Sequence, residues 1–339
     1  MYIEIITTPN SALKESGFGT SIACINILEA IHKMGYNAKL NVCRSKGDLK
    51  EIVKRKPGLV VLAVKYIPIE GEKSIWLADY FDQHRINFTG SIGDVLKFDS
   101  NKVLAKTHLI NKGINTADYF MANPGQYETE HDLPIKFPLF LKPLDAANGN
   151  GIDDLSYVTN FKDFVKKVES IYNTFNQPVL VERYLGGHEY SVAIIEAPDK
   201  KLIVSAVEIV PPTSSNGLKI LGAKAKKDDT EKLLKICDNN IKNKIIELAI
   251  DAYKALGARD FGRIDIKSNN DGDCFFLEAN LVPGMTLGSS YFPLACEIEH
   301  EFTYEKVIEL LLGNGLARAF STLPPNVNPE PNGKIVAFK

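Results

Sequence analysis

Apolar and polar positions along the first hundred residues alternate in a way that predicts strands and helices in turn. Residues 2–7 are typical of a strand, and residues 21–34 show an apolar repeat typical of a helix that stops at Gly35. The nearly continuous apolar run at 59–67 is typical of a buried parallel strand. The same pattern predicts a strand at 37–43, helices at 48–56 and 73–84, and a strand near 86–88. This alternation predicts a doubly wound α/β domain, which we expect to end near Lys97.

The rest of the chain mixes strands and helices with longer loops. Residues 102–112 predict a helix, and residues 137–142 predict a strand that runs into a glycine-bearing loop at 143–151. A lysine at a strand end before such a loop suits phosphate binding, because backbone N–H groups and an ammonium both attract anions. The other predicted elements are helices at 160–172, 241–256 and 304–319, strands at 179–182, 190–196 and 202–210, and a loop over the site at 211–229.

The stretch from Gly262 to Thr286 contains two short apolar/polar runs joined by Asn-Asn-Asp-Gly-Asp. Asp-Gly between such runs favours a hairpin with a type I′ turn, whose central residues are then Asp271 and Gly272. Directly opposed residues share a face of a hairpin. The predicted opposed pairs are Asp265 with Glu278, Arg263 with Asn280, and Ile266 with Leu277. The predicted apolar face consists of Ile264, Ile266, Phe275, Leu277 and Ala279.

The polar face of this hairpin has two interpretations. Directly opposed carboxylates have Cβ atoms only about 4.5–5.5 Å apart and repel each other, so Asp265 and Glu278 need a neighbour that offsets their charge. In the first interpretation the face is solvated, and Arg263 and Lys267 dilute the repulsion. In the second, the two carboxylates hold a divalent cation with Asn280 as a third oxygen ligand. Oxygen ligands without His or Cys suit Mg²⁺, which proteins usually share with substrate phosphates.

The motifs in this stretch carry a family resemblance. The pattern R-x-D, then F-L-E-A-N, then P-G-M-T resembles the carboxy-terminal signature of the D-alanine–D-alanine ligase group of ATP-grasp enzymes. The resemblance implies an α/β (α+β ATP-grasp) fold with a Rossmann-like N-terminal domain, followed by two ATP-grasp subdomains with ATP between them. We expect these three parts at residues 1–97, 98–187 and 188–339.

The resemblance also implies which residues bind ATP. Lys102 and Lys142 lie where the family has two phosphate-binding lysines, and Lys224 resembles the third, although Lys226 is an alternative. The segment from 181 to 185 resembles the hinge that holds adenine. Its residues Glu182, Arg183 and Leu185 are the expected adenine contacts, with Glu189 expected at the ribose. For each glutamate the alternative is a surface residue at a strand end. The family signature assigns ATP and Mg²⁺ as cofactors, with Mn²⁺ as a possible substitute.

Two positions depart from the family pattern near the substrates. Asn148 stands where these ligases have a serine, and Ala225 stands where they commonly have tyrosine or histidine. Glu15 is the candidate for a family glutamate that contacts substrate. Ser289 or Ser290 is expected to bind the carboxylate of the second substrate; one extra residue in this chain leaves the choice between them open.

Composition excludes several other classes of protein. The chain has 339 residues, 45% of them hydrophobic, and a net charge of −2, which gives no reason to expect nucleic acid or an anionic membrane as a partner. Five spread cysteines without a C-x-x-C pair are typical of a reducing cytoplasm, and we expect a cytoplasmic protein without membrane attachment. The family resemblance favours a homodimer.

The expected activity is an ATP-dependent carboxylate–amine ligase that joins amino-acid-type substrates through an acylphosphate. Arg263 and the backbone N–H of Gly284 are the candidates for stabilising the tetrahedral intermediate. One alternative is a D-alanine–D-alanine ligase of cell-wall synthesis with an atypical lid. An alternative of another class is a non-catalytic ATP-binding sensor or scaffold, for which Arg263 and three metal ligands would not be needed.

Overall fold

The N-terminal part of the molecule is a parallel α/β unit, as its alternating pattern predicts. The computed structural model describes residues 1–13, 18–144, 149–212, 220–222, 228 and 230–321. Three parallel strands form a sheet in the order β2-β1-β3. The bounds here are β1 (Tyr2–Thr7), α1 (Ser21–Lys33), β2 (Asn37–Val42), α2 (Lys46–Arg55), β3 (Leu59–Leu62) and α3 (Leu77–Gln83). Strand β1 is buried along almost its whole length, so this sheet forms the centre of the unit.

Local signals fix the ends of the first two helices. The Thr20 side chain accepts a hydrogen bond from the backbone N–H of Ala23 at the start of α1. Ser45 and Asp48 form a reciprocal capping box at the start of α2. Gly35, just after α1, has φ of 83°, a conformation that favours glycine at a helix end.

The predicted elements of this unit needed three corrections. The strand predicted at 59–67 leaves the sheet after Leu62, and β4 (Tyr66–Ile67) instead pairs antiparallel with β5 (Ile75–Trp76). The strand predicted near 86–88 is reduced to one bridge between Val60 and Phe88. A helix that the pattern did not predict, α4 (Gly93–Ser100), leads into the next unit.

A four-stranded antiparallel sheet in the order β6-β9-β7-β8 forms the second unit. Helix α6 packs on this sheet, and its apolar side chains share a core with the buried side chains of β7 and β9. Strand β6 was not predicted. The bounds are α5 (Lys102–Ile110), β6 (Tyr119–Ala122), β7 (Leu139–Pro143), β8 (Tyr157–Val158), α6 (Phe161–Phe175) and β9 (Val179–Arg183).

A five-stranded antiparallel sheet in the order β12-β11-β10-β13-β14 forms the third unit. The chain enters it through Gly187, where a Cβ atom would lie 2.3 Å from the Asn269 carbonyl oxygen, so only glycine fits without a shift. Strand β12 and helix α9 were not predicted. The bounds are β10 (Glu189–Glu196), β11 (Leu202–Val210), β12 (Lys232–Lys235), α8 (Asn239–Ala255), β13 (Phe261–Ser268), β14 (Cys274–Asn280), α9 (Tyr291–His300) and α10 (Tyr304–Ser321).

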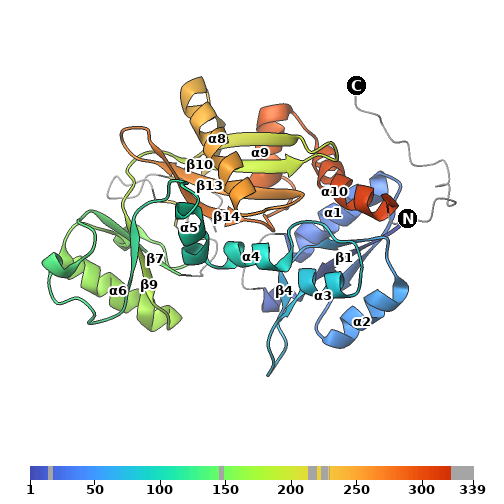
Figure 1. Ribbon diagram of the computed structural model, residues 1–339, viewed down its shortest axis with the longest axis horizontal. Coiled ribbons are helices and arrows are strands. Elements are labelled where there is room, and N and C mark those ends of the chain that lie inside the picture. Colours follow the sequence, from blue (N-terminus) through green and yellow to red (C-terminus); the bar gives the residue numbers. More distant parts are fainter. Residues whose placement is uncertain (14–17, 145–148, 213–219, 223–227, 229, 322–339) are drawn as a thin grey trace.

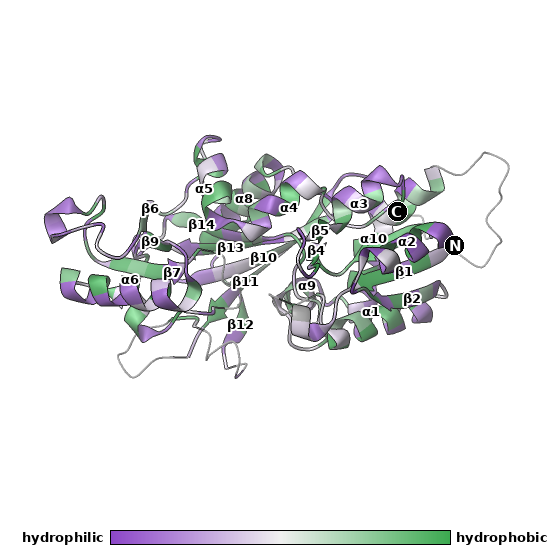
Figure 2. Cartoon of the chain, turned by 90° about the horizontal axis from the view of Figure 1, so that it is seen from below, coloured by the Kyte–Doolittle hydropathy of each residue, from purple (hydrophilic) through white to green (hydrophobic). Residues whose placement is uncertain are grey.

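The three units lie along the long axis of the molecule (Figures 1 and 2). Strands β7 and β9 with α6 form one end, the sheet containing β10, β13 and β14 lies in the middle, and β1 with α1 and α2 forms the other end. Two apolar cores include side chains from both the N-terminal sheet and the five-stranded sheet. These two units are therefore packed together, while the four-stranded sheet has a core of its own. The expected domain limits at residues 97 and 187 remain a prediction.

The hairpin of β13 and β14 forms, but its turn differs from the prediction. Gly272 has φ of 81°, whereas Asp271 is not among the described residues with positive φ, so a type I′ turn is not present. The backbone N–H of Asn269 donates to the carbonyl of Asp273, so three residues form the loop. Near this loop the register is therefore shifted by one residue from the prediction.

A β-bulge after Asp265 removes that shift. Asp265 pairs with Glu278 and Arg263 with Asn280, as predicted, but Ile266 pairs with Phe276 and not with Leu277. Phe276 is fully buried in the apolar core, and the predicted apolar face was wrong for Phe275 and Leu277. A bulge of this kind re-aims a side chain. Here Leu277 lines the pocket described next.

Among the described residues, no helix combines the length and the apolar character needed to cross a membrane.

Candidate active site

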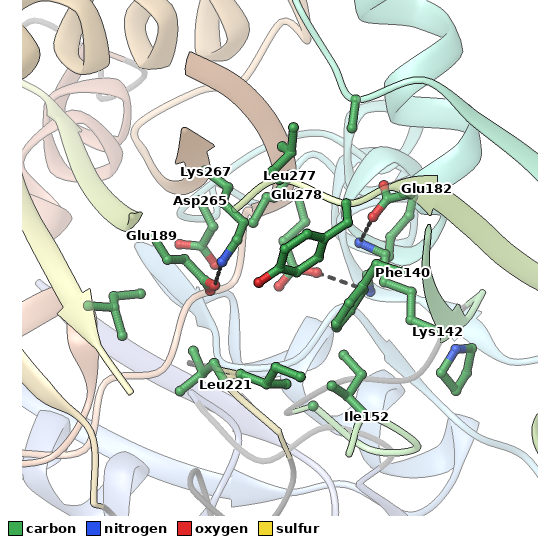
Figure 3. A pocket seen from close by; sticks show the side chains of 18 of the residues that line it. Phe140, Lys142, Ile152, Glu182, Glu189, Leu221, Asp265, Lys267, Leu277 and Glu278 are labelled. Atoms are coloured by element: carbon green, nitrogen blue, oxygen red, sulfur yellow. Dashed lines mark hydrogen bonds and ion pairs between the residues drawn. The ribbon is translucent and has the colours of Figure 1, made fainter. Parts of the chain in front are cut away.

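A pocket lies between the four-stranded and five-stranded sheets (Figure 3). Strands β7 and β9 supply one wall, and the hairpin of β13 and β14 with Glu189 supplies the other. In Figure 3, Glu182 and Lys142 lie on one side, Glu189 and Lys267 on the other, and Glu278 between them. The predicted site residues that line this pocket are Lys102, Lys142, Glu182, Arg183, Leu185, Glu189, Asp265 and Glu278.

Asp265 is the centre of a hydrogen-bonded cluster on the hairpin. The planar guanidinium of Arg263 donates from Nε to Oδ1 at 2.9 Å and from Nη2 to Oδ2 at 2.8 Å. Ser191 of β10 donates to Oδ1 at 2.7 Å, and the Asn280 side-chain amide donates to Oδ2 at 3.0 Å. Burial would lower the pKa of Arg263, but the charge of Asp265 and its hydrogen bonds raise it, so the guanidinium stays protonated. Asp265 thus has a cation beside it before any metal is considered.

Glu278 is paired with a lysine from outside the hairpin. Lys102, the first residue of α5, places its ammonium 3.1 Å from Glu278 Oε2. The side chain of Asn101 caps α5 by accepting a hydrogen bond from the backbone N–H of Leu104. This cap fixes the start of the helix and therefore the point from which the Lys102 side chain reaches the pocket.

Glu182 lies between two lysines. Lys142 at the end of β7 is 2.7 Å from one carboxylate oxygen, and Lys106 of α5 is 2.7 Å from the other. Burial would raise the pKa of Glu182, but the two ammonium charges and their hydrogen bonds lower it to about 2. Burial lowers the pKa of Lys106, which the charge of Glu182 opposes. Glu182 is therefore ionised at neutral pH, and its side chain contacts lysines.

Two further residues predicted to bind the nucleoside, Glu189 and Arg183, have ionic partners. Glu189 is 3.3 Å from Lys267, and both side chains face the pocket in Figure 3. Arg183 turns its guanidinium towards Asp118 at 2.7 Å, where both side chains are more than half exposed. Leu185 is buried and lines the pocket.

The P-G-M-T segment leaves the hairpin and leads into α9. Tyr304 of α10 donates a 2.7 Å hydrogen bond to the carbonyl of Met285, which fixes this segment. The Ser290 hydroxyl accepts a hydrogen bond from the backbone N–H of Thr286 at 2.8 Å. Ser290 precedes α9, and Ser289 lies in the turn before it. Gly284, Ser289 and Ser290 are not among the described residues that line the pocket.

Tyr291, the first residue of α9, links the pocket to Arg263. Its ring lies 5.4 Å from the Arg263 guanidinium carbon, and its hydroxyl donates to Glu231 just before β12. Burial, with the neighbouring Glu231, raises the pKa of Tyr291. The phenol therefore stays protonated as a hydrogen-bond donor. Glu15, Asn148, Lys224, Ala225 and Lys226 lie outside the described residues.

The sequence interpretation missed three residues of this site. Lys106 lies four positions after Lys102, so the two share a helix face, and that spacing was a usable signal. Ser191 lies two positions after Glu189, on the same face of β10, and it is paired with Asp265 in register. Tyr291 had no signal, because α9 itself was not predicted.

The chemistry of the hairpin cluster fits a hard divalent cation. Asp265 and Glu278 offer carboxylate oxygens, and Asn280 offers an amide oxygen beside them. The described residues contain no group of three or more His, Cys, Asp or Glu side chains placed to hold a metal alone. Mg²⁺ commonly takes one or two carboxylates and completes its shell with water and substrate phosphates. The donor set therefore suits a cation that arrives with a nucleotide.

Two sheets that enclose a pocket lined by lysines and carboxylates are the arrangement expected of an ATP-grasp enzyme. A family model described as D-ala D-ala ligase C-terminus matches residues 109–313. The D-alanine–D-alanine ligase of Actinobacillus pleuropneumoniae serotype 5b is 27% identical over 289 residues, which cover 84% of this chain and 90% of that protein. The ligase of Aquifex aeolicus is 29% identical over 234 residues, 67% of this chain and 73% of that protein.

A solved structure supports the same fold. The D-alanine–D-alanine ligase from Bacillus anthracis complexed with ATP has a TM-score of 0.69 and 19% identity, and covers 95% of this chain and 99% of that chain. The chain belongs to the D-alanine–D-alanine ligase family. It is accordingly an ATP-dependent C–N ligase, and the predicted class and fold are confirmed.

Proposed function

We propose that the chain binds ATP in the pocket between the two sheets and joins an amino-acid carboxylate to an amine. The carboxylate oxygen attacks the γ-phosphorus of ATP, and ADP leaves with the electrons of the broken P–O bond. The amine nitrogen then attacks the carbonyl carbon of the acylphosphate, inorganic phosphate leaves, and the nitrogen loses a proton. The observation that supports the proposal is that lysines and the hairpin carboxylates line one pocket, with Lys102 paired to Glu278.

We assign the nucleotide an orientation along the pocket. The hinge at 181–185 holds the base, Glu189 holds the ribose, and Lys102 and Lys142 contact phosphates. Lysines suit this role because an ammonium is a mobile point charge with three donors. Lys224 retains its predicted phosphate role, with Lys226 as the alternative. The exposed Arg183 guanidinium faces Asp118, so we assign Arg183 a backbone contribution.

We assign Mg²⁺, or Mn²⁺ in its place, to Asp265, Glu278 and Asn280. The ion supplies charge neutralisation to the phosphate oxygens when it is bound. The residues of the chain prepare its ligands: Ser191 and Asn280 hold the Asp265 carboxylate in one orientation, and Lys102 holds Glu278. Such supporting hydrogen bonds orient metal ligands and tune their affinity.

Arg263 and the backbone N–H of Gly284 are assigned to the tetrahedral intermediate. Arg263 is held rigidly by Asp265 and by the ring of Tyr291, so its charge is fixed before the reaction begins. Donors that need no reorganisation are the most effective in stabilising developing negative charge. The Ser290 hydroxyl accepts from the Thr286 backbone and keeps its own proton for the carboxylate of the second substrate, while Ser289 remains the alternative.

Two observations bear on the identity of the substrates. The first is in the sequence: Asn148 and Ala225 differ from the residues that the family resemblance expects around small amino acids, and a residue as small as alanine at 225 is the reason to expect a bulkier substrate. We therefore propose a product other than D-alanyl-D-alanine, with Glu15 near the first substrate. The names of the relatives favour the second candidate, a D-alanine–D-alanine ligase of cell-wall synthesis.

One experiment separates the candidates. The pure protein is incubated with Mg-ATP and pools of L- and D-amino acids, ADP release is followed, and mass spectrometry identifies condensed products. A mixed or bulkier dipeptide as the best product supports the first candidate. Efficient formation of D-alanyl-D-alanine, with no better product from the wider pool, establishes the second. No ADP release with any pool would contradict both. A homodimer is the proposed assembly, and light scattering of the same sample tests it.

A further inference from the structure

A buried cluster of three charges connects the pocket wall to the interior. Glu182 of β9 receives Lys142 on one oxygen and Lys106 on the other, each at 2.7 Å. The two lysines differ in position: Lys142 lines the pocket, whereas Lys106 is fully buried and is not among the described lining residues. The cluster has one negative and two positive charges, and only one of the positive charges faces the pocket.

Lys106 also reaches the other sheet. Its ammonium donates a 3.3 Å hydrogen bond to the carbonyl of Phe276, next to the bulge of the metal-binding hairpin. The Phe276 backbone N–H in turn donates to the carbonyl of Asn115. Lys106 therefore contacts β9 of the four-stranded sheet and β14 of the five-stranded sheet from the single helix α5.

A buried carboxylate needs one full counter-charge, because an unpaired ion is strongly disfavoured away from water. If Lys142 alone neutralised Glu182, its ammonium would be committed to that ion pair. A second cation changes this balance: with Lys106 as the interior partner of Glu182, the cluster keeps one net positive charge at the pocket wall. A nucleotide phosphate brings the matching negative charge.

We propose that Lys106 is a positioning residue for nucleotide binding, which neutralises Glu182 so that the charge of Lys142 serves the phosphates. This proposal depends on the proposed function, since it takes the pocket to be the nucleotide site. Lys106 acts through Glu182 and Lys142 and does not touch the nucleotide.

The test compares ligands with and without phosphates. Adenosine and ADP, the latter with Mg²⁺, displace a fluorescent ADP analogue from the wild-type protein, from Lys106→Met, and from the double variant Lys106→Met with Glu182→Gln. The ratio of the two affinities measures the preference for phosphates, whatever the variant does to the base. Lys112→Met removes an equal charge from an exposed position just beyond α5 and is the matched control.

Lys106→Met should lower the preference for ADP over adenosine by about tenfold or more, which is the scale of one charge-assisted hydrogen bond. The double variant removes one charge of each sign, so the wild-type preference should return. Lys112→Met should leave it unchanged. An unchanged preference in Lys106→Met, or an equal loss for adenosine and ADP, would overturn the proposal, because a purely structural lysine affects both ligands alike.

The charge-balanced double variant keeps the test decisive if Lys106→Met does not fold. A wild-type preference in that variant supports the proposal, whereas a reduced preference shows that the charge of Lys106 acts on the phosphates directly. Failure of the wild-type protein to bind either ligand would instead contradict the proposed nucleotide site. The two failures are therefore distinguishable.

Discussion

Replacement of Arg263 by lysine tests the proposed chemistry most directly. The guanidinium makes two parallel hydrogen bonds to Asp265, at 2.9 and 2.8 Å, and lies over the ring of Tyr291. A lysine keeps the positive charge but cannot form this planar fork. The charge balance of the hairpin is therefore preserved in Arg263→Lys, and only the geometry of the donors changes.

The expected magnitude follows from that geometry. Removal of one preorganised donor to a developing oxyanion typically lowers turnover by about 10²–10³, or about 2.7–4 kcal/mol. Arg263→Lys should lower kcat by that factor. ADP affinity should change by less than about threefold, because an interaction made mainly in the transition state leaves ground-state binding intact. Steady-state ADP release and calorimetric titration of Mg-ADP measure the two quantities separately.

A second arginine provides the control. Arg55 forms the same kind of fork with Glu4, with contacts of 2.6 and 2.7 Å, in the N-terminal unit away from the pocket. Arg55→Lys should therefore leave kcat and ADP affinity unchanged and affect stability alone. If Arg263→Lys keeps near-normal kcat, the arginine only offsets the charge of the hairpin carboxylates, and the oxyanion assignment is refuted.

Three further predictions concern charges of the hairpin, of the Asp99 side chain that anchors it, and of Glu182. Asp265→Asn combined with Glu278→Gln should reduce Mg²⁺ affinity by more than the roughly 10–100-fold typical of losing an outer-shell partner, and normal Mg²⁺-dependent turnover would show that the metal lies elsewhere. Asp99→Asn should lower the free energy of unfolding by about 3–5 kcal/mol in urea titrations, since it removes one charge of the buried ion pair with Lys65. A loss below about 1 kcal/mol would contradict this. Because the pKa of Glu182 falls from 4.5 to about 2 on folding, its stabilisation is complete above about pH 4.5 and is lost as the pH drops towards 2, an effect of about 3 kcal/mol. Urea titrations at several pH values should show that the free energy of unfolding of the wild-type protein falls below about pH 4.5. The same free energy should fall less in Glu182→Gln.

The hairpin shows how far pattern reasoning reaches. The polar pairs of Asp265 with Glu278 and of Arg263 with Asn280 were predicted correctly, from a type I′ turn placed at Asp271 and Gly272. The predicted turn was wrong, and the bulge at Leu277 corrected the register before the functional pairs. Alternation indicates which residues share a face, but it cannot locate one inserted residue within the continuous apolar run Phe275-Phe276-Leu277. The fully buried Phe276 identifies the bulge only when the core is known.

Buried ion pairs were the least predictable part of the site. Glu182 was expected to face adenine, yet its side chain is held between two lysines that are 76 and 40 positions away in the chain. The roles of Glu182 and Lys142 in nucleotide binding remain predictions. A sequence shows where charges occur, but the partner of a buried charge depends on tertiary packing. Helix α9 was missed for a different reason. Its first turn contains a proline, which helix starts tolerate, and no side-chain hydrogen bond caps it.

Residues outside the hairpin of β13 and β14 hold its backbone in place. Asp99 accepts hydrogen bonds from the backbone of Leu281 and Val282, at 2.5 and 3.1 Å, and is paired with Lys65 of the N-terminal unit. Lys106 holds the same strand at Phe276 from the opposite end. Because both anchors act on the backbone, side chains around the substrate can change without moving Asp265 or Glu278. The backbone of the signature hairpin can therefore stay fixed while the side chains around it differ between members of the family.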